Sequence, residues 1–147
     1  MRTREDLVLD VMPLGEAILG FSNRWYAYAF ANAATLTLEP GLDVHIATAA
    51  AFLAMKWEAF ASRGAADPMS SHDLEDLITV VAGRAGIVAD VHAAPEEIRH
   101  LIRNRTAAFL AAEWAPAILE GNLPDARRVP GFMDNVLRCF QQLTAAD

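Results

Sequence analysis

Apolar residues recur at helical spacing through most of this sequence, and this pattern limits what the chain can fold into. In four stretches after Thr48 they stand three and four positions apart, which places them on one face of a helix. The residues expected to face inward are, stretch by stretch, Phe52, Leu53, Trp57 and Phe60; Leu74, Leu77, Ile78 and Val81; Ile98, Leu101, Ile102, Phe109 and Ala112; and Phe132, Val136, Leu137, Phe140 and Leu143. Because each helix must bury its apolar face, we predict a helical bundle for residues 48–147.

Capping residues predict where the first two helices begin. Thr48 is a good N-cap for a helix that runs to about Ser62. Ser70 is expected to open the second helix, with Asp73 three residues later at the spacing of a capping box. Gly83 is expected to end this helix, since glycine is a weak helix former.

The third and fourth helices are expected to begin at prolines. Pro95 suits the N1 position of a helix, where no backbone N–H is needed. Glu96 and Glu97 follow it, and the helix dipole favours acids in the first turn. We predict that this helix continues to about Ala115 and that the last helix begins near Pro130.

Residues 1–47 carry strand signals instead. Residues 7–12 form a short apolar run that stops at Pro13, as expected of a buried strand. Residues 35–38 and 42–46 are typical of two strands, and Glu39-Pro40-Gly41 between them is typical of a turn. The predicted fold class is therefore α+β, with an N-terminal strand and a β-hairpin followed by a predominantly helical bundle.

An aromatic cluster lies between the predicted strand and the predicted hairpin. Ser22 or Asn23 can cap a short helix here. The rings on this helix are Trp25, Tyr26, Tyr28 and Phe30. Packing in a protein core explains them better than stacking against nucleic-acid bases.

Length, composition and charge limit the class of protein. The 147 residues fit a single domain, and 54% of them are hydrophobic, which disfavours disorder of the whole chain. The formal net charge of -7 disfavours a broad nucleic-acid-binding surface, because phosphate backbones repel it. The single cysteine, Cys139, excludes an internal disulfide and fits a core position. We find no secretory signal and no membrane-spanning stretch, and we expect a cytoplasmic protein.

Asp10 is an acid inside an apolar strand pattern. Burial of a lone carboxylate is costly, so a buried Asp10 needs a metal ion, a basic side chain or several N–H donors as partners. The alternative is that Asp10 stands at the end of the strand and faces solvent. Residue spacing alone leaves both interpretations open.

Lys56 and Arg63 stand seven residues apart, which is two helical turns. Both therefore point to the same side of the predicted helix. Two cations on one face can hold phosphate oxygens. The alternative is a solvated stripe opposite the apolar face of the helix.

Acids gather at the start of the second helix. Asp73 and Asp76 share a helix face, and Glu75 lies between them. The helix dipole favours acids here, so capping is one interpretation of Asp73. His72 could serve as a metal ligand or a base, although no second histidine stands at the spacing of a zinc site.

Several of these segments follow one another in a recognisable order. They are residues 9–13, residues 18–26, residues 52–60, Arg63-Gly64, Asp67 and residues 71–77. Over residues 7–84 their order and spacing resemble bacterial nucleotidyltransferase-like proteins of the AbiEii/AbiGii toxin type. The resemblance includes a Lys-x-x-Ala-x-x-x-Arg helix, here Lys56 to Arg63, and an Asp-x-x-Asp-Leu helix, here Asp73 to Leu77.

The resemblance implies a function and roles for five residues. Enzymes of this superfamily transfer a nucleotidyl group from a nucleoside triphosphate (NTP) to an acceptor, and three acids on neighbouring strands hold Mg²⁺. By resemblance, Asp10 is the third of these acids and the metal ligand, and Lys56 contacts the phosphates of the nucleotide. Arg63 assists or holds the acidic helix, and Asp73 and Asp76 match acidic positions whose role is catalytic or structural.

The sequence departs from the family before Asp10. A Gly-Ser turn and an Asp-x-Asp strand are expected there, and residues 1–9 contain neither. We therefore expect a truncated or degenerate nucleotidyltransferase fold that is inactive alone, with a remnant of the sheet in residues 1–47 and a helical part in residues 48–147. The setting implied is toxin–antitoxin or phage defence. One alternative is a non-catalytic helical module that binds phosphate or a partner, with a protein partner or a second copy pairing at its open sheet edge. Another is a plain helical domain in which the acids only cap helices.

Overall fold

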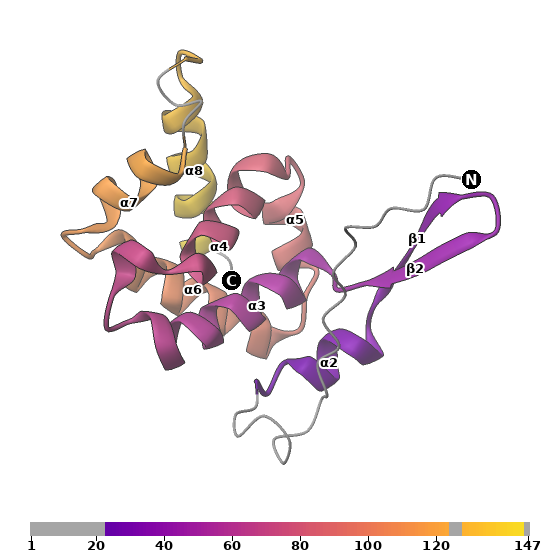
Figure 1. Ribbon diagram of the computed structural model, residues 1–147. Helices are drawn as coiled ribbons and strands as arrows, with labels where there is room; N and C mark the ends of the chain where they lie inside the picture. Colours follow the sequence, from indigo (N-terminus) through magenta and orange to yellow (C-terminus); the bar gives the residue numbers. More distant parts are fainter. Residues whose placement is uncertain (1–22, 124–127, 146–147) are drawn as a thin grey trace, which may run out of the picture.

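The structure is a computed structural model that describes residues 23–123 and 128–145. The strand predicted at residues 7–12, and Asp10 within it, lie outside the described residues. In chain order the elements are α2 (Tyr26–Ala31), β1 (Ala34–Glu39), β2 (Leu42–Ile46), α3 (Ala49–Ala59), the π-helical turn η1 (Phe60–Gly64), the 3-10 turn η2 (Pro68–Ser70), α4 (His72–Gly83), α5 (Ile87–His92), α6 (Glu96–Leu110), α7 (Ala115–Asn122) and α8 (Phe132–Thr144). A hairpin followed by a helical bundle confirms the predicted α+β class (Figure 1).

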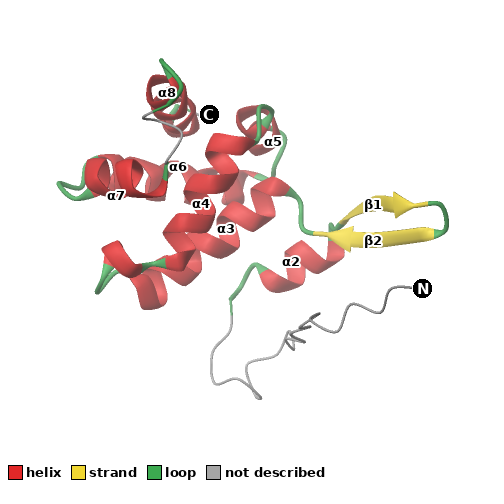
Figure 2. Cartoon of the chain, turned by 45° about the horizontal axis from the view of Figure 1, so that its top comes forward, coloured by secondary structure: helices red, strands yellow, loops and turns green. Residues whose placement is uncertain are grey.

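Helix α3 lies within the bundle and contacts α4, α5 and α6 (Figure 2). Helix α8 closes the bundle against α6, α4 and α5. The inward stripe predicted for α4 is confirmed, because Leu74, Leu77, Ile78 and Val81 are all buried. None of the helices in the described part of the chain is long and apolar enough to span a membrane.

Aromatic rings join four segments at the centre of this core. The Phe109 ring lies 5.9 Å from that of Trp57, 5.8 Å from that of Trp114 and 5.5 Å from that of Phe140, between centroids. Phe109 and Trp57 are buried, and Trp114 packs against the core while partly exposed. These contacts tie α3, α6 and α8 together, since aromatic pairs add to the free energy gained by burial.

The N-cap predicted for α3 is confirmed, whereas the one predicted for α4 is wrong by one residue. The Thr48 hydroxyl accepts a hydrogen bond from the Ala51 N–H at 3.3 Å. Before α4, the turn η2 extends to Ser70, and Ser71 is the residue that caps the helix by accepting from the Leu74 N–H at 3.4 Å. Asp73 is therefore not at the capping-box position.

Two short helices were not predicted. The third predicted helix ends at Leu110 rather than near Ala115, and α7 begins at Ala115 as a separate helix. Pro116 stands in the first turn of α7, where proline is tolerated, whereas inside a longer helix it would break a backbone hydrogen bond. The other is α5, which has six residues and buries Ile87 and Val91. At the start of α6, Pro95 is the N-cap residue rather than N1.

The hairpin has one apolar face that the described residues leave exposed. Its register pairs Ala34 with Ile46 and Leu36 with Val44, and Gly41 in the turn has φ +86°. Leu38 is 59% exposed and Leu36 is 44% exposed. In both views the hairpin extends away from the helices (Figures 1 and 2). An uncovered apolar face is unusual, because two isolated strands are only marginally stable.

The aromatic cluster before the hairpin divides between core and surface. Trp25 is buried, whereas Phe30 is 74% exposed, so the prediction of core packing is wrong for Phe30. The Asn23 side chain donates to the Met55 carbonyl at 2.8 Å and accepts from the Trp25 N–H at 3.1 Å. Asn23 therefore fastens the start of the described chain to α3, and the N-cap position of α2 is Trp25.

Candidate functional site

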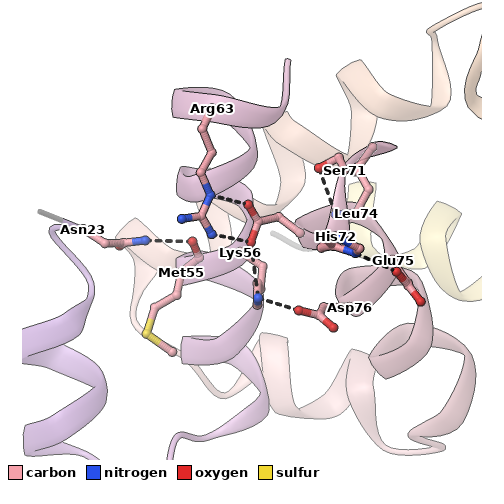
Figure 3. A network of polar contacts seen from close by, with 10 residues as sticks. Asn23, Met55, Lys56, Arg63, Ser71, His72, Leu74, Glu75 and Asp76 are labelled. Carbon is pink, nitrogen blue, oxygen red and sulfur yellow. Dashed lines mark hydrogen bonds and ion pairs between the residues drawn. The ribbon is translucent and has the colours of Figure 1, made fainter. Parts of the chain in front are cut away.

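Charged side chains from α3, η1 and α4 meet beside the first turns of α4 (Figure 3). Lys56 comes from α3, Arg63 from η1, and Asp73 and Asp76 from α4. All four are candidate site residues predicted from the sequence. The structure joins them in one network of ion pairs, which we call the charged cluster.

Asp73 is the buried centre of the charged cluster. Its side chain is 6% exposed, and its two oxygens accept hydrogen bonds from Arg63 Nε and Nη2, both at 2.9 Å. This two-point contact fixes the plane of the carboxylate. The oxygen Oδ1 also accepts from Lys56 Nζ at 3.2 Å. Asp73 therefore joins η1 and α3 to α4.

Lys56 lies between two carboxylates. Its ammonium is 3.2 Å from Asp73 Oδ1 and 2.5 Å from Asp76 Oδ2. The Lys56 side chain is 24% exposed, so the solvated-stripe interpretation does not hold for it. An ammonium has three N–H donors, and the two carboxylates engage two of them. Among the described residues no further acceptor hydrogen-bonds to this ammonium, so its third N–H can take another one.

The π-helical turn η1 places Arg63 within reach of Asp73. It follows α3 directly and ends at Gly64, which is buried. A Cβ atom added to Gly64 would lie 2.6 Å from Phe60 Cδ2 and 2.6 Å from Ser71 Oγ. The chain therefore needs glycine here because the cap of α4 and the Phe60 ring approach its backbone. Single π-turns of this kind are frequent at functional sites.

We expect Gly64→Ala to lower the free energy of unfolding by about 1–3 kcal/mol, because the new methyl group overpacks this contact. Urea denaturation followed by circular dichroism measures the change. Gly83→Ala is the matched control, since nothing lies within 4 Å of a Cβ atom at Gly83. Equal midpoints for the two variants would contradict the close approach at Gly64.

Ion pairing outweighs burial in the charged cluster. Burial favours a lower pKa for Lys56, yet its hydrogen bonds to Asp76 and Asp73 raise the pKa above the usual value. Burial favours a higher pKa for Asp73, yet the hydrogen bonds from Arg63 and Lys56 hold the pKa below the usual value. The hydrogen bond to Asp73 likewise raises the pKa of Arg63. The formal charges of the four residues sum to zero.

Comparisons of the chain with protein-family models, with curated proteins and with solved structures found no match. The predicted family and the roles that it implies therefore stay predictions.

His72 points into solvent rather than into the charged cluster. Its side chain is 93% exposed, and Nδ1 lies 3.2 Å from Glu75 Oε2 one turn along α4. Figure 3 shows the pair of His72 and Glu75 on the side of α4 away from Arg63. A surface pair of this kind contributes little to stability.

The described residues do not include a cluster of three or more metal-ligating side chains, that is, of His, Cys, Asp or Glu close enough to hold a metal ion. Arg63 and Lys56 engage both oxygens of Asp73, which leaves Asp76 as the one carboxylate of the charged cluster with an open edge. The predicted Mg²⁺ ligand, Asp10, lies outside the described residues, so that prediction stays untested.

A cavity of about 500 Å³ lies at the base of the hairpin. Its walls come from α2, the two strands, α3, α4 and the end of α5. Phe52 is one wall, and the Lys56 ammonium lies 5.6 Å from the centroid of the Phe52 ring. From the sequence, Phe52 was expected only in the core. The cavity was not predicted, because the residues that form its walls are distant in sequence.

Proposed function

We propose that this chain is a nucleotidyltransferase-like protein that holds the triphosphate of an NTP at Lys56. The observation that carries this proposal is the position of the Lys56 ammonium, which two carboxylates of α4 fix while its side chain stays 24% exposed. The resemblance supports it, because it joins the Lys56–Arg63 helix to the acidic helix that follows.

The charged cluster provides a cation that is already in place. Lys56 is hydrogen-bonded to Asp73, and Arg63 holds the Asp73 carboxylate in place. The Lys56 side chain therefore loses little conformational freedom when a phosphate binds. The raised pKa of Lys56 keeps the ammonium charged at neutral pH. A fixed positive charge beside phosphate oxygens stabilises the negative charge that develops during phosphoryl chemistry.

The two acids of α4 differ in what they can do. Asp73 is buried and fully engaged, so we propose that it positions Lys56 and Arg63. Asp76 has a side chain that is 46% exposed and, among the described residues, ion-pairs with Lys56 alone, so we propose that its second oxygen is available to a substrate. In a nucleotidyl transfer the acceptor oxygen attacks the α-phosphorus and pyrophosphate leaves. We propose a toxin–antitoxin setting in the cytoplasm, on the resemblance alone.

Lys56→Ala is expected to weaken NTP binding by about 100-fold or more, because a charge-assisted contact to phosphate disappears. Calorimetric titration of each of the four NTPs into the folded chain measures this affinity. Arg138→Ala is the matched control, since it removes one positive charge from an exposed position on α8. NTP affinity that is equal in the wild type and in Lys56→Ala, or no affinity in either, would overturn the proposal.

The exposed apolar face of the hairpin favours a second candidate function, which is pairing with another chain. Leu36, Leu38, Leu42 and Ile46 are all exposed hydrophobic residues of the two strands. We expect Leu38→Glu to reduce concentration-dependent self-association or partner binding, because a charge on this face opposes its burial. Light scattering after gel filtration measures self-association. A wild type that stays monomeric at high concentration, with no bound partner, would contradict this candidate.

A further inference from the structure

We propose that the cavity at the base of the hairpin binds the nucleoside end of the nucleotide whose phosphates Lys56 contacts. This inference rests on the proposed function. It assigns the phosphates of the nucleotide to Lys56 and the nucleoside to the cavity. A cavity of about 500 Å³ falls within the range of small-molecule sites.

The cavity and the charged cluster adjoin along two helices. Phe52 and Lys56 are one turn apart on α3, and the Phe52 ring lies 5.6 Å from the Lys56 ammonium. Val80 and Asp76 are one turn apart on α4, and Val80 is another wall of the cavity. The same two helices therefore carry the cation and the cavity walls. A ligand with an anionic end and an apolar, flat end fits this juxtaposition.

The walls of the cavity suit a planar nucleobase. Tyr28 and Phe52 supply rings, while much of the remaining wall consists of small side chains such as Ala49 and Ala94. Aromatic rings stack against bases without discriminating strongly between them. The alanines leave room beside the rings, since each has a single methyl group.

The rim offers hydrogen-bonding groups to the edge of a base. Arg84 and Asp90 both line the cavity and form an ion pair through Arg84 Nε and Asp90 Oδ2. The guanidinium has further N–H donors, and the carboxylate has further acceptor capacity. A donor beside an acceptor matches the edge of each of the four bases, so the test below uses all four NTPs.

The test compares each NTP with inorganic tripolyphosphate by calorimetry on the folded chain. We expect the preferred NTP to bind at least about ten-fold more tightly than tripolyphosphate, because stacking adds to the phosphate contacts. Ala94→Leu adds bulk to the cavity wall. It is expected to reduce NTP affinity to that of tripolyphosphate and to leave tripolyphosphate affinity unchanged. Ala107→Leu, on an exposed position of α6 outside this cavity, is the matched control.

A second pair of variants tests the same assignment in case Ala94→Leu does not fold. Phe52→Leu removes a ring from the cavity, and Phe30→Leu removes an exposed ring elsewhere. Only Phe52→Leu is expected to lower the preference for NTP over tripolyphosphate. If tripolyphosphate binds at Lys56 as tightly as every NTP does, the cavity assignment is wrong while the proposed function stands. If neither ligand binds, both proposals fail together.

Discussion

Asp73→Ala is expected to lower the free energy of unfolding by about 2–3 kcal/mol, since it removes the buried partner of two cations. Asp73 has a side chain that is 6% exposed and accepts hydrogen bonds from both Arg63 and Lys56. The loss is expected at the lower end of the range for buried pairs, because both cations can reach water. Urea denaturation at neutral pH measures the change.

Asp76→Ala is the matched control for this prediction. Asp76 lies three residues away on the same helix, forms an ion pair with Lys56 alone among the described residues, and has a side chain that is 46% exposed. Exposed ion pairs contribute up to about 1 kcal/mol, so the effect is expected to be smaller. Equal losses for the two variants would mean that Asp73 is not the structural centre of the charged cluster.

The stability difference between the wild type and Asp73→Ala is also expected to depend on pH. The pKa of Asp73 is lowered in the folded state, so its contribution is present above the unfolded-state pKa of about 3.9 and is lost as pH falls through the folded-state pKa. The difference between the two proteins should therefore be constant near neutral pH and shrink below about pH 4. A difference that persists unchanged at lower pH would point to lost packing rather than lost charge.

Phe109→Ala is expected to lower the free energy of unfolding by about 3–5 kcal/mol, because it leaves a cavity among packed rings. Phe109 is 3% exposed and contacts Trp57, Trp114 and Phe140. Phe30→Ala is the control, since Phe30 is exposed and a surface substitution changes stability by about 0.5 kcal/mol or less. A loss below about 1 kcal/mol at Phe109 would contradict the central role of these rings.

Sequence periodicity predicted the long helices well because their apolar residues lie on one side. The predicted inner residues of α4, Leu74 to Val81, are all buried. The short helices α5 and α7 were missed, since six or eight residues give too few repeats to establish a period. Pro116 was the signal that could have separated α7 from α6. The exposure of Phe30 could not be predicted, because it depends on how the hairpin and α2 lie against the bundle.

The candidate site was predictable in part for a similar reason. The seven-residue spacing of Lys56 and Arg63 correctly indicated one shared side. Whether that side faces α4 depends on how the helices pack against one another. The spacing alone therefore could not show that both cations contact Asp73. The capping interpretation of Asp73 arose from its place near the helix start. In the structure Ser71 caps the helix instead, and the Asp73 carboxylate forms the ion pairs.

Lys56 is the only lysine in the sequence, so its contact with phosphates can be tested directly by chemical modification. The protein is acylated with an amine-reactive ester in the presence and absence of the preferred NTP, and mass spectrometry follows the peptide that contains Lys56. We expect the triphosphate to slow acylation of Lys56, the nucleoside alone to slow it less, and acylation of the chain's α-amino group to be unchanged. Equal acylation of Lys56 with and without saturating nucleotide would contradict the claim that Lys56 contacts the phosphates.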